Sequence, residues 1–347
     1  MTKLEQMYET IALLTMDAKG ILAADESTST IAKRFAAVKI ENTEENRRQY
    51  RELLFTAPDL SDYISGVILF EETFYQQDKH GKTFPELLLQ QGIVPGIKVD
   101  KGLIDLSGTD NEQISTGLDD LAERLVHFRN LGARFAKWRN VFKISQFTPT
   151  KMAIKAGTET LARYAAICQD AGIVPIIEPE ILMDGSHDIL SCADVTSRVL
   201  HELFNNLYDY NVDLRSIILK TNMITAGKEH APFSTPEEVA DFTAYVLCDH
   251  VPVSVPSVNF LSGGQSPQQA ADNLNSINLI ELFPWNVSFS YGRALQQECL
   301  KTWQGKAENI EAAQHALIHA CQQNSLASVG ELYEVFEDSV CEHDHLH

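Results

Sequence analysis

Short apolar runs alternate with longer segments of helical periodicity along most of the chain. The runs are apolar at nearly every position, which is typical of strands in a parallel sheet that is covered on both faces. The longer segments repeat apolar residues every three or four positions, which predicts amphipathic helices. We therefore predict eight strands, at residues 20–25, 65–72, 94–101, 134–144, 173–181, 216–223, 257–264 and 286–293.

The predicted helices between these strands carry their own boundary signals. Gly132 and Gly172 follow two of them, in the place where a glycine commonly ends a helix. Thr235 and Pro236 begin another, as an N-cap residue and a first-turn proline. The clearest helical segments are residues 43–57, 117–132, 158–172 and 235–251.

An extra helix is predicted before the first strand. In "MTKLEQMYETIALLTMDAKG", Leu4, Met7, Ile11 and Leu14 fall near helical spacing. The segment has no apolar core of the kind that a cleavable signal peptide carries. We therefore expect an amphipathic helix that belongs to the folded protein.

Eight strands that alternate with helices predict an α/β protein with the (β/α)8 TIM-barrel architecture. We expect a single domain over residues 1–347, in which about 329–347 form a polar, mobile tail. A doubly wound open sheet is the alternative architecture. It is disfavoured because no glycine-rich dinucleotide loop follows the first predicted strand.

Composition narrows the possible partners and compartment. The 347 residues are 44% hydrophobic, which is ample for a large core. The net charge of −20 predicts repulsion from nucleic acid and from anionic membranes, and no run reaches the ~18 apolar residues of a membrane span. Six scattered cysteines without a CxxC pair are typical of a reduced, cytoplasmic protein.

Acidic and basic residues follow the predicted strands at their carboxyl ends. In a barrel these ends meet at one rim, where barrel enzymes carry out their chemistry. A polar strand end can also simply meet solvent, but acids and bases that share one rim predict a cluster with shifted pKa values. The residues concerned are Asp25, Glu71, Glu72, Asp100, Lys101, Lys137, Arg139, Glu178, Glu180 and Lys220.

Lys220 is the candidate nucleophile, because it ends the apolar run "SIILK". In a desolvated mouth near other cations the pKa of a lysine falls, so more of it is a free amine. A free amine can attack a ketone and form a Schiff base. Groups that could assist as positive neighbours or as acids and bases are Lys137, Arg139, Glu178, Glu180 and Asp25.

Two glycine-containing segments, "LSGGQS" and "SYGRA", follow the seventh and eighth predicted strands. Barrels commonly bind phosphate at this place, with free backbone N–H groups and helix N-termini; an ordinary tight turn is the alternative. The candidate residues are Ser262, Gly263, Gly264, Ser290, Gly292 and Arg293. Across the rim a second phosphate could meet Ser27, Thr30, Lys33, Arg34 and Lys101, unless these only cap and solvate a helix.

Metal and serine-hydrolase sites are not predicted. Of the 11 histidines only those in "EHDHLH" cluster, and no HExxH sequence occurs. There is also no GxSxG sequence of the kind that presents a nucleophilic serine. The sequence therefore predicts no metal ligands.

Nine motifs in order resemble those of class I fructose-bisphosphate aldolases. They are "GILAADEST…IAKRF", "ENTEENRR", "GVILFEET", "GIKVDKG", "FAKWR", "VPIIEPEI", "LKTNM", "FLSGGQS" and "SYGRALQ", spread over about residues 18–328. The resemblance implies a barrel lyase that needs no metal or other cofactor. It would cleave fructose 1,6-bisphosphate reversibly into dihydroxyacetone phosphate and glyceraldehyde 3-phosphate, in glycolysis and gluconeogenesis, commonly as a homotetramer.

The resemblance also implies a role for individual residues. Lys220 would form the Schiff base, Glu178 with its partner Glu180 would be the general acid and base, and Asp25 would take the proton from the hydroxyl on carbon four. Lys137, supported by Arg139, would stabilise charge. The carbon-one phosphate would meet Ser262, Gly263, Gly264, Ser290, Gly292 and Arg293, and the far phosphate Ser27, Thr30, Arg34 and Lys101, with Arg47 as a further candidate.

Two positions depart from the family pattern. Thr221 stands where the family usually has proline, and the chain ends in His347 where animal members end in a tyrosine that helps to protonate the enamine. The last tyrosine is Tyr333, so this step has no assigned residue. The alternatives are an aldolase that prefers another ketose bisphosphate, such as sedoheptulose 1,7-bisphosphate, and a silent scaffold, although every candidate catalytic position holds a competent residue.

Overall fold

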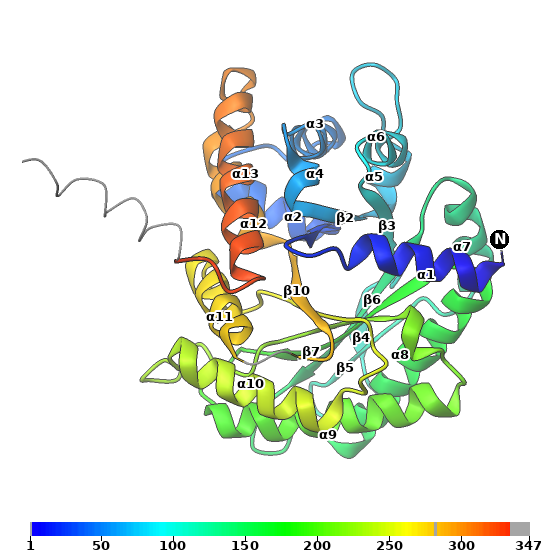
Figure 1. The fold of residues 1–347 in the computed structure, drawn as a ribbon, viewed down its shortest axis with the longest axis vertical. Coiled ribbons are helices and arrows are strands. Elements are labelled where there is room, and N and C mark those ends of the chain that lie inside the picture. The colour runs from blue at the N-terminus through cyan, green and yellow to red at the C-terminus, as the bar shows by residue number, and fades with distance from the viewer. Residues whose placement is uncertain (1, 281–282, 334–347) are drawn as a thin grey trace, which may run out of the picture.

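Eight parallel strands of the described chain close into a barrel with helices around it (Figure 1). The computed structural model describes residues 2–280 and 283–333. Each barrel strand pairs with the next one along the chain, and the last pairs back with the first. This confirms the predicted TIM barrel, whose strands are β1 (Gly20–Ala24), β2 (Ile64–Leu69), β3 (Val94–Lys98), β6 (Phe135–Lys143), β7 (Val174–Leu182), β8 (Ile218–Thr221), β9 (Ser257–Phe260) and β10 (Asn286–Tyr291).

Strand ends and one hairpin differ from the prediction. The strand β3 ends at Lys98 and β8 at Thr221, before the last residues of the predicted runs, because the chain leaves the sheet there to form the rim. A small antiparallel hairpin, β4 (Leu103–Asp105) with β5 (Gln113–Ser115), was not predicted. It lies directly after β3 in the chain.

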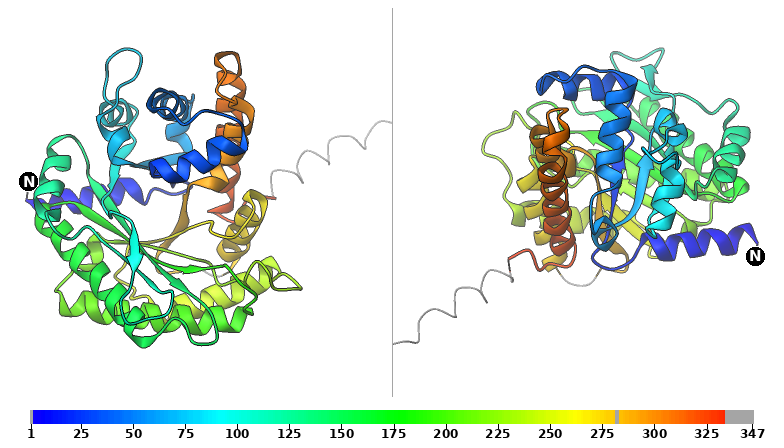
Figure 2. Two further views of the ribbon diagram at one scale, coloured as in Figure 1. Left: turned by 180° about the vertical axis from the view of Figure 1, so that it is seen from behind. Right: turned by 90° about the horizontal axis from the view of Figure 1, so that it is seen from above.

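The helices cover the barrel on its outside (Figure 2). Helix α8 begins at Lys151 rather than at residue 158, because the hydroxyl of Thr150 accepts a hydrogen bond from the N–H of Ala153 and caps it there. Gly172 ends this helix with a φ of 73°, as predicted. The helices are α1 (Lys3–Leu14), α2 (Thr28–Ala37), α3 (Glu44–Phe55), α4 (Leu60–Tyr63), α5 (Glu71–Tyr75), α6 (Phe84–Gln90), α7 (Leu121–Asn130), α8 (Lys151–Ala171), α9 (Ile189–Asp209), α10 (Pro236–His250), α11 (Pro267–Leu279), α12 (Arg293–Trp303) and α13 (Ile310–Ala327), with 3-10 turns at Leu214–Ser216 and Ala307–Asn309.

The predicted N-terminal helix, α1, lies across one end of the barrel (Figure 1). Its buried residues Met7, Ile11 and Leu14 join a cluster with Phe135, which fills the barrel interior at this end. A Cβ atom on Gly96 would lie 2.2 Å from the Phe135 ring, so only glycine leaves room for that ring. The other members of the cluster are Ile21, Ala23, Ile68, Val94, Val174, Ile176 and Ile218.

The predicted mobile tail lies mostly outside the described residues, because the structure describes nothing beyond Tyr333. Helix α13 ends just before this tail, at Ala327. None of the helices in the described ranges is both long and apolar enough to cross a membrane.

Candidate active site

The carboxyl ends of the strands surround a cavity of about 850 Å³, at the end of the barrel opposite α1. Nearly all of the predicted site residues line this cavity, although they come from distant parts of the chain. Those that line it are Asp25, Ser27, Thr30, Arg34, Lys101, Lys137, Arg139, Glu178, Glu180, Lys220, Ser262, Gly263, Gly264, Ser290, Gly292 and Arg293.

Strand register brings the central side chains to the same height. Ile176 of β7 is aligned with Ile218 of β8, and two residues further along each strand stand Glu178 and Lys220. Side chains two apart on a strand point to the same face, so both face the barrel interior. Arg139 of β6 is aligned with Glu178, which adds a third strand to the group.

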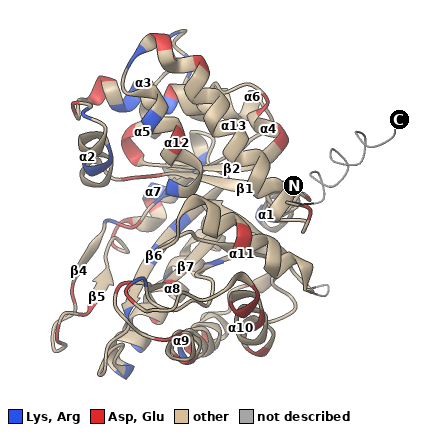
Figure 3. Cartoon of the chain, turned by 90° about the vertical axis from the view of Figure 1, so that its left-hand side faces the viewer, with Lys and Arg blue, Asp and Glu red and all other residues tan. Residues whose placement is uncertain are grey.

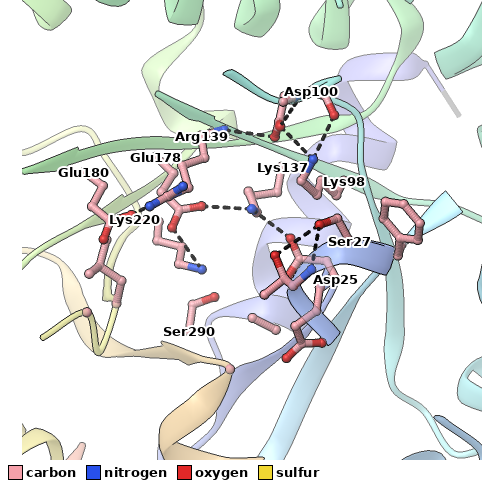
Figure 4. Close-up of a pocket in the computed structure, with 18 of the residues that line it drawn as sticks. Asp25, Ser27, Lys98, Asp100, Lys137, Arg139, Glu178, Glu180, Lys220 and Ser290 are labelled. Atoms are coloured by element: carbon pink, nitrogen blue, oxygen red, sulfur yellow. Dashed lines mark hydrogen bonds and ion pairs between the residues drawn. The ribbon is translucent and has the colours of Figure 1, made fainter. Parts of the chain in front are cut away.

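A chain of opposite charges runs across the cavity floor (Figure 4). The Nζ atom of Lys137 lies 2.8 Å from Asp25 Oδ2 and 3.1 Å from Glu178 Oε2. The other oxygen of Glu178 lies 3.4 Å from Nζ of Lys220. Side-chain exposure is 5% for Lys137, Glu178 and Lys220, so these groups interact with little solvent between them.

The charge chain shifts the pKa values of its members. Burial raises the pKa of Asp25, but Lys137 and Lys220 outweigh it and hold that pKa below its usual range. The pKa of Glu178 is lowered as well, because the same two lysines outweigh its burial. Burial lowers the pKa of Lys137, but Asp25 and Glu178 outweigh it and raise that pKa. Two carboxylates and one permanent ammonium group therefore stand beside Lys220 at neutral pH.

Glu180 binds Arg139, whose Nε donates to the Glu180 carboxylate. The backbone N–H of Arg139 donates to Asp100 Oδ2 at 3.3 Å, and Lys98 Nζ donates to Asp100 Oδ1 at 2.6 Å. Lys98 also lines the cavity and was missed as a site residue. The signal was present in "GIKVDK", since Lys98 and Asp100 are two apart at a strand end.

On the β9 and β10 side of the cavity, Ser290 presents a buried hydroxyl that has no hydrogen-bond partner among the described residues. Helix α12 begins beside it at Arg293, and its N-cap Gly292 offers no side-chain cap. The first turn of α11, in contrast, is already capped by Ser266. The uncapped helix N-terminus on this side is therefore that of α12. The segment "SGG" packs closely against the acidic residues of the site, since a Cβ on Gly263 would lie 2.8 Å from the Glu180 carboxylate.

The start of α2, which follows β1, builds a neighbouring part of the cavity, because β1 pairs with β10. Ser27 caps this helix, its hydroxyl accepting from the N–H of Thr30 at 3.3 Å, and Arg34 follows one turn later. Lys101 is half exposed and pairs with Asp120 at 3.2 Å. These polar groups can face an anion that enters from solvent.

Arg47 is not brought to this side, contrary to the expectation. It lies on α3 and does not line the cavity. Its guanidinium is held by both carboxylate oxygens of Glu72, at 2.7 Å and 2.6 Å. Glu72, which stands at the end of a predicted strand, therefore forms an ion pair with Arg47, the arginine that was expected to bind a phosphate.

The candidates for enamine protonation are not placed in the cavity. The hydroxyl of Tyr333 donates to Asp272 on α11, away from the lining residues, and His347 lies outside the described residues. In the described part of the chain, no group of three or more His, Cys, Asp or Glu side chains could hold a metal ion.

Comparisons of this chain with a family model and with relatives of known sequence point to one and the same family. A model of class-I fructose-bisphosphate aldolase matches residues 6–347. Fructose-bisphosphate aldolase 5, cytosolic, of Arabidopsis thaliana is 50% identical over 327 residues, which cover 94% of this chain and 91% of the plant protein. A probable fructose-bisphosphate aldolase class 1 of Xanthomonas axonopodis is also 50% identical, over 94% of this chain and 98% of the bacterial one.

A solved structure agrees with these relatives. It is a ternary co-crystal structure of fructose-bisphosphate aldolase from Plasmodium falciparum in complex with TRAP and a small-molecule inhibitor. The two chains superpose with a TM-score of 0.94 at 49% identity, over 95% of each chain. With a barrel that carries acids and lysines on one rim and with relatives of this identity, the chain belongs to the class-I fructose-bisphosphate aldolases, lyases of glycolysis.

Proposed function

We propose that this aldolase cleaves fructose 1,6-bisphosphate through a covalent imine between the ketone carbon and Nζ of Lys220. The observation that carries the proposal is the position of Lys220, buried at the cavity floor with Glu178 Oε1 at 3.4 Å. A lysine in such a place is within reach of an acid–base group and shielded from water.

The first steps need one proton to move between Lys220 and Glu178. Transfer from the ammonium group to the carboxylate leaves a neutral amine and a neutral acid side by side. The amine attacks carbon two, and the acid returns its proton to the carbinolamine hydroxyl, which leaves as water. Lys137 stays charged beside Glu178 Oε2, so it favours return of the carboxylate to its ionised form.

Bond cleavage follows from the iminium ion. Asp25 removes the proton from the hydroxyl on carbon four, and the carbon three–carbon four electron pair moves into the iminium to give an enamine. Glyceraldehyde 3-phosphate departs as the aldehyde. Protonation of the enamine at carbon three and hydrolysis then release dihydroxyacetone phosphate and regenerate Lys220.

The two phosphates bind to separate groups of residues in this proposal. The unpartnered hydroxyl of Ser290 and the uncapped start of α12 at Arg293 support a place for the carbon-one phosphate. Ser27, Thr30 and Arg34 at the start of α2 support a place for the carbon-six phosphate, with Lys98 or Lys101 as a further cation. Arg47 is left out of this set because Glu72 holds it.

Reductive trapping tests the covalent step. We expect borohydride with dihydroxyacetone phosphate to attach a reduced three-carbon adduct to the peptide that contains Lys220, as peptide mass spectrometry would show. Lys220→Arg should lose both the adduct and the cleavage activity. Lys228→Arg is the matched control, since Lys228 is an exposed lysine on the loop after the same strand and pairs with Asp184, and it should keep both. An adduct on another lysine, or none, would contradict the proposal.

The metal-free mechanism has its own test. We expect activity to persist after exhaustive treatment with EDTA, because each step above uses only side chains and substrate. Loss of activity that added Zn²⁺ restores would contradict it. A homotetrameric state and a cytoplasmic location remain proposals that rest on family resemblance, and sedimentation of the purified protein would test the first.

A further inference from the structure

A cluster of three charged side chains, Glu26, Arg34 and Arg51, lies next to Asp25, and only Arg34 among them has a part in the proposal above. Glu26 follows Asp25 in the chain and is 9% exposed. Its Oε2 lies 2.7 Å from Nη2 of Arg51, which is 2% exposed on α3, and its Oε1 accepts from Nη1 of Arg34 on α2. One carboxylate therefore pairs with two guanidinium groups, one on each oxygen.

Neighbouring side chains hold Glu26 in place from a third helix. Gln296 of α12 donates to Glu26 Oε1 at 3.0 Å and to the carbonyl of Ala23 at 2.8 Å. Its own side-chain oxygen accepts from the hydroxyl of Tyr50 at 3.1 Å. Because of these hydrogen bonds, the Glu26 carboxylate stays in place when Arg34 moves. At this place α2 carries basic residues alone, whereas α3 carries both acidic and basic ones (Figure 3).

Arg34 differs from the other two members because it is the most exposed of them, although Glu26 also lines the cavity. Its side chain is 25% exposed, compared with 5% for Glu26 and 3% for Arg51. It lines the cavity beside Ser27 and Thr30, on the side assigned to the far phosphate. A phosphate that recruits Arg34 must therefore compete with Glu26 for it.

Whether Arg34 can leave Glu26 for a phosphate depends on whether the negative charge of Glu26 is still compensated afterwards. A buried carboxylate that loses its partner is strongly destabilised, often by several kcal/mol. Burial raises the pKa of Glu26, but Arg51 first and Arg34 second outweigh it and hold that pKa below its usual range. With Arg51 still on Oε2, Glu26 remains compensated when Arg34 turns to an anion.

We propose that Arg51 is a positioning residue for the far phosphate: by neutralising Glu26 from behind, it leaves Arg34 free to bind the phosphate on carbon six. The inference rests on the proposed function, since it assigns one end of the same substrate. It makes Arg51 part of the preference for ketose bisphosphates over ketose monophosphates, although Arg51 itself does not line the cavity.

The test compares two substrates that differ only at the far end. In Arg51→Met, Glu26 keeps a single cation and holds Arg34 more firmly. We expect KM for fructose 1,6-bisphosphate to rise about tenfold, the size of one charge-assisted contact. KM and kcat for fructose 1-phosphate, which has no phosphate on carbon six, should change less than about twofold.

Two further variants separate this role from a purely structural one. Arg51→Lys keeps the charge and should restore most of the affinity for the bisphosphate. The double variant Arg51→Met with Glu26→Gln removes the competitor of Arg34, so its KM for the bisphosphate should return to within about threefold of the unmodified protein. Arg51→Gln serves as a second neutral variant, with the same expectation as Arg51→Met, in case the methionine variant does not fold.

Each of the remaining outcomes overturns the proposal. They are an equal rise of KM for both substrates, no rise for the bisphosphate, no recovery in the double variant, or failure of both neutral variants to fold, which would make Arg51 a folding residue. Failure of the proposed function is distinguishable, because the unmodified protein would then fail to cleave fructose 1,6-bisphosphate or to form the borohydride adduct on Lys220.

Discussion

Thr221 occupies the position directly after Lys220, where the family usually has proline. Lys220 points into the barrel, so Thr221 points outwards to the helices. It is fully buried, and its hydroxyl has no hydrogen-bond partner among the described residues. A buried polar group without a partner costs about 1–3 kcal/mol of stability. The hydroxyl is therefore a local weakness next to the proposed nucleophile.

Replacing Thr221 by valine removes this hydroxyl while keeping the shape of the side chain. We expect Thr221→Val to raise the free energy of unfolding by about 1 kcal/mol and to leave kcat within twofold. Urea titration and a cleavage assay would check both.

Thr243 is the matched control, because its buried hydroxyl accepts from the N–H of Ile224 at 2.9 Å. Thr243→Val should therefore destabilise the protein by about 1–3 kcal/mol. A loss of stability in Thr221→Val would mean that the hydroxyl has a partner.

At the residue level, the sequence predicted which residues form the site better than it predicted which of their side chains pair with one another. Sequence placed Lys220, Glu178 and Lys137 at one rim because strand ends of a barrel must meet there. The family resemblance implied that Glu180 is the partner of Glu178, and in the structure Glu180 binds Arg139. Arg51 gave no signal, since it is an arginine within an ordinary charged helix, and only the fold brings that helix behind Asp25.

Among the elements, α1 has a structural task that its sequence only partly suggests. Its spacing predicted an amphipathic helix, and the structure shows that its apolar face closes the barrel against Phe135. Leu14 is 1% exposed in this seal, whereas Leu13, its neighbour in the same helix, is 50% exposed. The two leucines therefore allow a test within one turn.

Leu14→Ala should leave a cavity in the seal and lower the free energy of unfolding by about 2–5 kcal/mol. Leu13→Ala should change it by less than about 0.5 kcal/mol. Both variants should keep kcat at temperatures where they are folded, because the site lies at the other end of the barrel. Denaturant titration and assays at 25 °C would check this, and equal losses in the two variants would contradict the assigned packing.

The predictability of the other elements follows from their burial. The eight barrel strands were found because nearly all of their residues are buried and apolar. The hairpin of β4 and β5 was missed because its strands have three residues each and are partly exposed, with Ile104 at 55%, so no apolar run marks them. Register and the end of each strand depend on tertiary contacts that no local pattern records.

The molecule as a whole carries a net charge of −20, yet its cavity collects lysines and arginines. They are balanced there by carboxylates from different strands, as Lys137 of β6 is by Asp25 after β1 and Glu178 of β7. This balance ties distant parts of the barrel together. It also links the stability of the fold to pH.

The lowered pKa values of Asp25 and Glu178 mean that both contribute stability above their ordinary pKa of about 4, which is lost as pH falls through the lowered values. The raised pKa of Lys137 means that its contribution is present below about 10.4 and is lost as pH rises through the raised value. We expect the free energy of unfolding to be level between about pH 6 and 9 and to fall below about pH 4.5.

Urea titrations at a series of pH values would measure this profile. Asp25→Asn with Glu178→Gln should flatten the acid limb. Asp184→Asn, which removes an exposed carboxylate outside the cavity, should leave it unchanged. An acid limb of equal slope in all three proteins would place its origin elsewhere.

The seal made by α1 and Phe135 also determines the route by which substrate enters and products leave. Because it closes the far end of the barrel in the described part of the chain, substrate, both products and water pass through the cavity at the carboxyl ends of the strands. The fragment bonded to Lys220 cannot depart first, so the aldehyde must leave past it before hydrolysis frees the ketone. We expect dihydroxyacetone phosphate to inhibit cleavage competitively against fructose 1,6-bisphosphate and glyceraldehyde 3-phosphate to inhibit it noncompetitively; the reverse pattern in steady-state kinetics would contradict this order. The bond to Lys220 thus sets the order in which the products leave, and the helix that closes the other end makes them leave by the same route.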